Sequence, residues 1–286
     1  MRAPVTILLS SVALAAALTA CGGGGPSKAT FVTKADGSCA AGNAAIAGVT
    51  KPTNPTQIGA GAATAASTID GQVSALRALK PRGSDTQQFA GVVSAIADVS
   101  GPAKALQDAA GKNDDAAIGK AAVDLQSKVD TAATQGQAFG LTQCGVGLKP
   151  AVGNLFDGTK SVVKAGFVTK AEALCRAANT KINAIATPGS TLASVSKYFD
   201  AVMVISNKLA ADLKALPTPP GDEGAVNEFN AAFDALNAKG KDTAAAAKAN
   251  NAKLVVALSD ELDVAGTALN AKLDAYGLKV CGTTGS

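Results

Sequence analysis

Four of the five cysteines lie far apart in the chain, in positions that favour disulfide bonds over reactive thiols or a metal site. They are Cys39, Cys144, Cys175 and Cys281. No two of them form a Cys-x-x-Cys pair, and the sequence contains no histidine, so it lacks the usual combinations of zinc ligands. An even number of cysteines is typical of disulfide-bonded proteins in oxidising compartments. We therefore expect two disulfides, for which three pairings are open.

Carboxylates are the other side chains that could carry chemistry. Without histidine, neither a Ser-His-Asp nor a Cys-His arrangement can form. The candidate acids fall into three groups: Asp260, Glu261 and Asp263; Asp222 and Glu223; and Asp114 and Asp115. The first group lies mostly off the apolar stripe of a predicted helix, and the others lie at turns and helix starts, where acids complement the helix dipole. We interpret all three as solvated surface groups, and we expect no metal, no cofactor and no enzymatic activity.

The composition predicts that nearly all of the structure that positions these residues is helical. The chain is rich in alanine, the strongest helix former, and only 3% of its residues are aromatic. Its formal net charge of +4 arises from interleaved basic and acidic residues. It has no basic cluster with aromatic platforms of the kind that binds single-stranded nucleic acid. We therefore expect no nucleic-acid partner.

The 286-residue chain contains an internal duplication. The sequence FVTKA occurs at 31–35 and at 167–171, and a Cys and an Asn follow at equal distances in both places. The sequence GL-x-x-CG occurs near the end of both copies. Five consecutive identities in register indicate that one unit occurs twice. We expect three segments in the body of the protein: repeat 1 at 31–145, a linker at 146–166 and repeat 2 at 167–286.

Each repeat has the pattern of four amphipathic helices. Short turns between such helices favour an antiparallel four-helix bundle. Thr33-x-x-Asp36 and Thr169-x-x-Glu172 look like capping boxes, and we expect them to open the first helix of each repeat. The predicted fold is all-α, with two tandem antiparallel four-helix bundles that are related by duplication.

Apolar residues recur at helical spacing in both repeats. In the second helix of repeat 2 they are Tyr198, Val202, Ile205, Leu209 and Leu213. Such a stripe could line an apolar ligand cavity, but a bundle core is the interpretation that we favour. Asn43 and Asn179 occupy matching positions in the two repeats. We expect them to satisfy backbone groups across the bundle rather than to bind a ligand.

The duplication selects one of the three cysteine pairings. Cys39 and Cys175 lie near the start of the first helix of each repeat. Cys144 and Cys281 lie just past the end of the last helix. In an up-down bundle these two positions lie at the same end. We therefore predict the disulfides Cys39–Cys144 and Cys175–Cys281, each of which closes one bundle.

The start of the chain has the pattern of a bacterial export signal. Arg2 supplies a positive charge, and a run of apolar, small and hydroxyl residues follows it. This run ends in Leu18-Thr19-Ala20-Cys21, which resembles the lipobox of bacterial lipoproteins. The resemblance implies that the signal peptide, 1–20, is removed and that Cys21 receives a diacylglycerol. The glycines that follow suggest that 21–30 is a flexible tether. An ordinary secretory signal with a chance cysteine is the alternative.

With this lipobox and the repeated segments FVTKA-x-x-x-C and GL-x-x-CG, the chain resembles the small Ala-rich helical lipoproteins of actinobacteria. The likeness implies a fold and a location on the extracytoplasmic side of the cell membrane, but no activity. We expect a non-enzymatic module that binds a protein or small ligand in the cell envelope. One alternative is a carrier with a small-ligand pocket between helices or between the repeats. Another is a carboxylate-based enzyme, which requires two acids that converge in a cleft.

Overall fold

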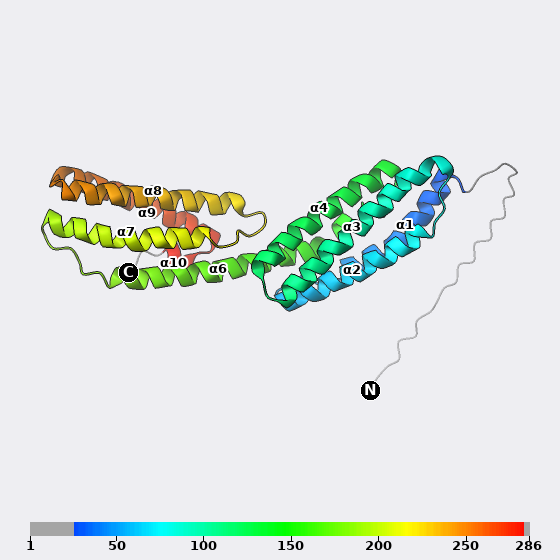
Figure 1. Ribbon diagram of the computed structural model, residues 1–286, viewed down its shortest axis with the longest axis horizontal. Helices are drawn as coiled ribbons and strands as arrows, with labels where there is room; N and C mark the ends of the chain where they lie inside the picture. Colours follow the sequence, from blue (N-terminus) through cyan, green and yellow to red (C-terminus); the bar gives the residue numbers. More distant parts are fainter. Residues whose placement is uncertain (1–25, 283–286) are drawn as a thin grey trace, which may run out of the picture.

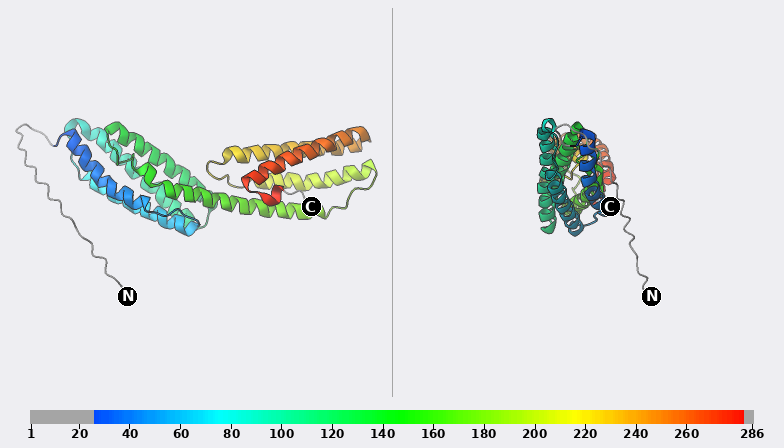
Figure 2. Two further views of the ribbon diagram at one scale, coloured as in Figure 1. Left: turned by 180° about the vertical axis from the view of Figure 1, so that it is seen from behind. Right: turned by 90° about the vertical axis from the view of Figure 1, so that its right-hand side faces the viewer.

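The computed structural model describes residues 26–282, and all the regular structure in this range is helical. The helices form two bundles that lie end to end, so the molecule is elongated (Figure 1 and Figure 2). The first bundle comprises α1 (Lys28–Ala47), α2 (Pro55–Arg77), η1 (Gly83–Asp85), α3 (Thr86–Gly111), α4 (Asp115–Phe139) and α5 (Leu148–Ala151). The second comprises the C-terminal half of α6 (Gly153–Asn183), α7 (Leu192–Lys214), α8 (Glu223–Lys248), α9 (Ala252–Tyr276) and α10 (Lys279–Gly282). The predicted all-α fold is confirmed.

The two bundles contain helices of equal length in the same order. Helices α2, α3 and α4 have 23, 26 and 25 residues, and α7, α8 and α9 have the same three lengths. Both α4 and α9 end at a glycine in the left-handed conformation, Gly140 with φ 97° and Gly277 with φ 107°. Glycine is favoured there because it has no Cβ to clash with the backbone. These matches agree with the duplication that the sequence indicates.

Both predicted disulfides are confirmed. The Cα atoms of Cys39 and Cys144 are 5.2 Å apart, and those of Cys175 and Cys281 are 5.1 Å apart. Cys39 of α1 bonds to Cys144 in the loop after α4, and Cys175 of α6 bonds to Cys281 in the short helix α10 after α9. Each bond therefore closes a loop that contains nearly the whole bundle.

The predicted capping boxes are wrong. Helix α1 begins at Lys28, and Ser27 caps it by accepting a hydrogen bond from Thr30 N. Thr33 lies inside this helix and donates its hydroxyl hydrogen to the carbonyl of Ala29 at 3.0 Å. Thr169 does the same inside α6, which begins much earlier, at Gly153. A threonine hydroxyl that bonds to the carbonyl four residues back is compatible with a helix interior, so the pattern did not mark a boundary.

The acids of those two motifs hold the segments that carry the second cysteine of each pair, the loop after α4 and the short helix α10. Asp36 accepts hydrogen bonds from the backbone N–H groups of Thr142, Gln143 and Cys144, at 2.8 to 3.1 Å. Burial alone would raise the pKa of Asp36, but these bonds outweigh it and lower the pKa. Glu172 accepts one such bond, from the backbone N–H of Val280 at 2.8 Å.

The repeated asparagines donate hydrogen bonds to the same two segments. Asn43 donates to the carbonyl of Gln143 at 2.8 Å, and Asn179 donates to the carbonyl of Val280 at 3.3 Å. Both bonds run across the bundle to a backbone group, as predicted for these residues.

The segment expected to be a linker, 146–166, is helical and belongs to the first bundle. It forms α5 and the first part of α6, which then continues into the second bundle without a break (Figure 1). Its apolar residues are buried in the core of the first bundle: Leu148, Val152, Leu155, Phe156 and Val163. The first bundle therefore contains a helical segment beyond the four helices of its repeat.

The close contact between α6 and the loop after α1 leads to a testable prediction. Gly158 of α6 lies against Pro52, so a Cβ at position 158 would overlap the proline backbone. We expect Gly158→Ala to destabilise the first bundle by about 1–3 kcal/mol, because the two segments must move apart. Urea unfolding would measure this. Gly153→Ala in the same helix is the control, since a Cβ there meets only open space. An equal effect of the two substitutions would contradict the prediction.

Candidate binding groove

The second bundle contains an open groove of about 650 Å³. We call it the α7–α9 groove, because α7 and α9 form its two walls. Helix α8 contributes Phe233, Leu236 and Asn237, and the C-terminal part of α6 lines one end together with Cys281. The volume lies within the range of about 300–1,000 Å³ that is usual for small-ligand sites.

The walls of the α7–α9 groove are mainly apolar. Helix α7 contributes Tyr198, Phe199, Val202 and Met203, all of which are only half buried. The rings of Tyr198 and Phe199 meet edge to face, with their centroids 5.7 Å apart. On the opposite wall, α9 contributes Leu262 and the bare backbone of Gly266. The helical spacing predicts Tyr198 and Val202 in a core stripe, but the structure places them in the groove.

The polar groups that line the α7–α9 groove are mostly neutral amides and hydroxyls, and the one on Asn237 belongs to a buried residue. Asn237 is 8% exposed, and its amide oxygen accepts a hydrogen bond from the Ser206 hydroxyl at 2.5 Å. Its amide nitrogen has no hydrogen-bond partner among residues 26–282, and it is not among the buried atoms that lack a partner, so it is open to the groove as a donor. Of the described residues that line the groove, none is Lys or Arg, and the exposed Asp263 is the only acid.

The corresponding region of the first bundle is filled by its own chain. There, α5 and the start of α6 cross the space between α2 and α4. Leu155 lies against Gly61 of α2, Phe156 lies beside Gln126 of α4, and Lys149 forms an ion pair with Asp130 of α4 at 2.8 Å. Helices α7 and α9 are the counterparts of α2 and α4. Among the described residues, no segment crosses the space between them.

The two copies differ in side-chain size where this segment packs. In α2 the four positions are small: Gly61, Ala62, Ala65 and Ala66. In α7 the matching positions are large: Tyr198, Phe199, Val202 and Met203. Small residues on α2 allow a helix to approach closely, whereas the large residues on α7 occupy part of that space themselves. The α7–α9 groove is the part of that space that these large side chains leave unfilled.

A second exchange accompanies the first. Met203 packs against Gly240 of α8, where a Cβ would meet the methionine side chain. In the first bundle the matching pair is Ala66 and Ala103, both buried. A methionine and a glycine in the second bundle thus replace two alanines in the first. The glycine of α8 therefore makes room for the large Met203 side chain beside the α7–α9 groove.

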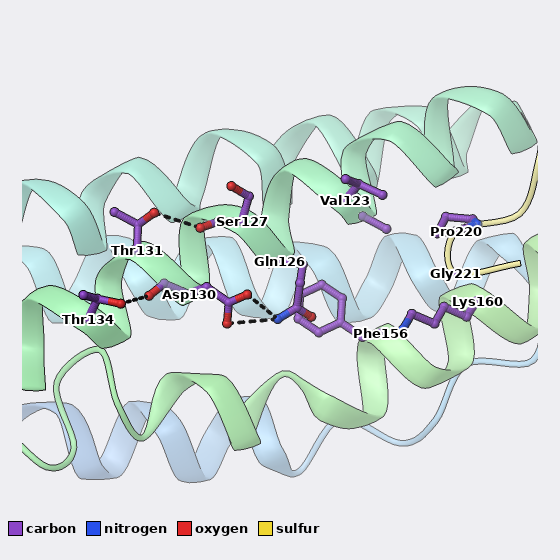
Figure 3. Close-up of a pocket in the computed structure, with 11 residues that line it drawn as sticks. Val123, Gln126, Ser127, Asp130, Thr131, Thr134, Phe156, Lys160, Pro220 and Gly221 are labelled. Atoms are coloured by element: carbon purple, nitrogen blue, oxygen red, sulfur yellow. Dashed lines mark hydrogen bonds between the residues drawn. The ribbon is translucent and has the colours of Figure 1, made fainter. Parts of the chain in front are cut away.

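A second groove, of about 550 Å³, lies at the junction of the two bundles (Figure 3). It is bounded by α4, the start of α6 and the α7–α8 loop at Pro220 and Gly221. Several of its polar groups already have partners within the chain. For example, Thr134 donates to the carbonyl of Asp130 at 2.9 Å, and the bond from Lys149 to the Asp130 carboxylate lowers the pKa of that acid. Unlike the α7–α9 groove, this groove is lined by a lysine, Lys160, and its acid, Asp130, is already paired.

The candidate acids at helix starts have structural partners. Asp114 accepts a hydrogen bond from a backbone N–H in the first turn of α4 at 3.0 Å, and Asp115 forms an ion pair with a lysine of α6 at 2.7 Å. Asp222 accepts a hydrogen bond from the Tyr276 hydroxyl at 2.8 Å, and burial together with this bond raises the pKa of Tyr276. Glu223 accepts a hydrogen bond from a backbone N–H in the preceding turn.

The third group of candidate acids lies on α9 and shares no partner with the acids at the helix starts. Glu261 forms an ion pair with a lysine of α8, and Asp260 and Asp263 are exposed. The structure brings no two of the three candidate groups together in one cleft. The predicted cysteine pairs form the two disulfides, and Cys175 and Cys281 also line one end of the α7–α9 groove. Cys21, the predicted lipidation site, lies outside the described residues.

Sequence reasoning missed several residues of the α7–α9 groove, namely Phe199, Met203, Asn237 and Gly266. The signal that could have found the first two was present. Once the repeats are aligned, the exchange of alanines in α2 for Phe199 and Met203 in α7 stands out. Asn237 matches a serine of α3 and gave no comparable signal.

No protein-family model, no curated protein and no solved structure matches this chain. Within residues 26–282, no helix is long and apolar enough to cross a membrane. The same residues contain no group of three or more Cys, Asp or Glu side chains that could hold a metal ion. The geometry defines a protein of two disulfide-closed helical bundles, one filled by its own chain and the other with an open groove.

Proposed function

We propose that this protein is a lipid-anchored binding module of the cell envelope, in which the second bundle binds the ligand and the first bundle supports it. The observation that carries the proposal is the difference between the two copies. The first bundle buries α5 and the start of α6 in its core, whereas the second has an apolar groove at the same place. Mainly apolar clefts with a few polar groups are typical of ligand sites.

The surroundings of the acids support binding rather than catalysis. General acid–base chemistry requires carboxylates that converge and whose pKa values are shifted toward neutrality. The candidate acids instead cap helices, pair with lysines or face solvent. Of the carboxylates for which the pKa departs from its usual value, those of Asp36, Asp70 and Asp130 are all lowered.

The arrangement of the bundles suits a protein held at its N-terminus. Helix α1 begins at the end of the molecule that is remote from the second bundle (Figure 1). With lipid on Cys21 and a short tether, the first bundle would lie next to the membrane. Helix α6, with 31 residues, would carry the second bundle away from the surface by up to about 45 Å. The α7–α9 groove would then face the envelope space.

The proposal predicts the behaviour of a Cys21→Ser variant. We expect the wild-type protein to fractionate with membranes and the variant to be soluble, because acyl chains contribute about 0.8 kcal/mol per buried methylene. We also expect native mass spectrometry to find the same non-covalent ligand on both forms, because the groove is remote from the anchor. Gly24→Ala is the control and should stay with the membrane. A soluble wild-type protein, or the absence of any ligand or crosslinked partner on both forms, would refute the proposal.

A further inference from the structure

We infer that the α7–α9 groove binds a neutral, mainly apolar small molecule that carries at least one hydrogen-bond acceptor. The inference deepens the proposed function and rests on it. It names the chemical class of the ligand, which follows from the size, the charge and the free polar groups of the groove.

The size of the groove favours a small molecule over a helix. In the first bundle, a helix reaches α2 because Gly61, Ala62 and Ala65 leave room for it. A helix with its side chains is about 10–12 Å wide. On α7 the matching positions hold Tyr198, Phe199 and Val202, which fill part of that width. The remaining volume of about 650 Å³ suits an elongated small molecule.

The charges of the groove favour a neutral molecule. An anionic group would find no Lys or Arg among the described lining residues, and it would approach Asp263. A cationic group would find only that exposed acid and no buried carboxylate. Moving an unpaired charge from water into an apolar site is strongly unfavourable. A neutral molecule avoids both problems.

The free donor in the groove requires an acceptor on the ligand. The amide nitrogen of Asn237 has no partner among the described residues, although the residue is 8% exposed. In the open groove, water can satisfy this nitrogen. A ligand that displaces the water must supply a carbonyl, ester or hydroxyl oxygen, because a donor that loses water without a replacement acceptor is unfavourable. The half-buried rings of Tyr198 and Phe199 and the flexible side chain of Met203 would then cover the apolar part of the ligand.

A neutral fluorescent dye, Nile red, can test the site with the full mature chain carrying Cys21→Ser. We expect one dye per chain, with affinity at least tenfold weaker in Gly266→Phe, because the new ring would project into the groove from a position with open space around it. Ser259→Phe on the same wall is a second filling variant, in case the first disturbs α9. Gly71→Phe is the matched control, an exposed helical glycine of α2 with equally open surroundings.

Competition against bound dye tests the ligand class. Monoolein, oleate and oleylamine share one acyl chain and differ in the charge of the head group. We expect monoolein to displace the dye at a concentration at least tenfold lower than either charged analogue. Equal displacement by a charged analogue, or equal dye binding in the two filling variants and the wild type, would overturn the inference. A chain that carries a ligand from the envelope but binds no dye overturns the ligand class alone, and a chain with neither overturns the proposed function as well.

Discussion

Loss of the Cys175–Cys281 disulfide is expected to unfold the second bundle near 37 °C, while loss of Cys39–Cys144 leaves the first bundle folded. The two bonds close loops of similar length, with sequence separations of 106 and 105 residues. In the chain-entropy model each therefore stabilises its bundle by about 4.7 kcal/mol. A domain's total stability is commonly about 5–15 kcal/mol. The difference must therefore come from what else holds each bundle together.

The core of the second bundle is much smaller than that of the first. The first bundle buries about twice as many apolar residues, among them those of α5 and the start of α6. The second bundle instead leaves large apolar side chains in water: Val204, Leu254, Val256 and Val264. Burial of apolar area supplies most of the folding free energy. The second bundle therefore retains a smaller free energy of unfolding when its disulfide is removed.

Hydrogen exchange resolved by peptide would measure this result. We expect Cys175→Ser with Cys281→Ser to remove protection from α7, α8 and α9 and to leave α2, α3 and α4 protected. The matched variant, Cys39→Ser with Cys144→Ser, should shift the melting temperature of the first bundle without abolishing its protection at 37 °C. Equal sensitivity of the two bundles would show that their cores do not differ in the way that burial indicates.

The disulfides could be predicted because they depend on topology and not on detailed packing. The duplication fixed which cysteines correspond, and an up-down order places Cys39 and Cys144 at one end whatever the exact helix ends are. The roles of Asn43 and Asn179 followed from the same reasoning. Each donates to a backbone carbonyl in the segment that carries the second cysteine of its bundle.

The helix starts were predicted wrongly because the motif has a long-range role. Thr33-x-x-Asp36 matches a capping box locally, but Asp36 bonds to residues about a hundred positions away. A local rule cannot distinguish these two uses of an acid. The segment 146–166 was predicted as a linker, and its helical and buried state was missed for a different reason. Its apolar residues have helical spacing, but they lie outside both repeats: Leu148, Val152, Leu155 and Val163. Their burial depends on the small residues of α2, which the sequence shows only when α2 is compared with α7.

Replacement of Asp36 is expected to destabilise the first bundle in a way that depends on pH. The carboxylate accepts three backbone hydrogen bonds at the loop that carries Cys144, and Cys144 itself is fully buried. Bonds to a charged acceptor are stronger than neutral ones, but water can replace those to the exposed Thr142 and Gln143. We therefore expect Asp36→Ala to lower the free energy of unfolding by about 2 kcal/mol at pH 7.

The sign of the pH dependence follows from the direction of the pKa shift. The pKa of Asp36 is lower in the folded protein than in the unfolded chain, where an aspartate titrates near 3.9. The carboxylate therefore contributes its full stabilisation above about pH 5, and this contribution is lost as the pH falls through the folded pKa. Asp36→Asn keeps the shape of the side chain but cannot ionise. The difference in unfolding free energy between wild type and Asp36→Asn should be largest at neutral pH and should shrink below pH 4.

Urea unfolding of the first bundle at pH 7 and at pH 3 would test both parts of this prediction. The control is Asp124→Asn, which removes an exposed acid that pairs with Lys120 one turn away in α4. We expect that change to alter the unfolding free energy by less than about 0.5 kcal/mol, because exposed ion pairs contribute little. The two asparagine variants would behave alike only if Asp36 does not hold the loop of Cys144. In that case the shared position of Asp36 and Glu172 in the two repeats would need another physical cause.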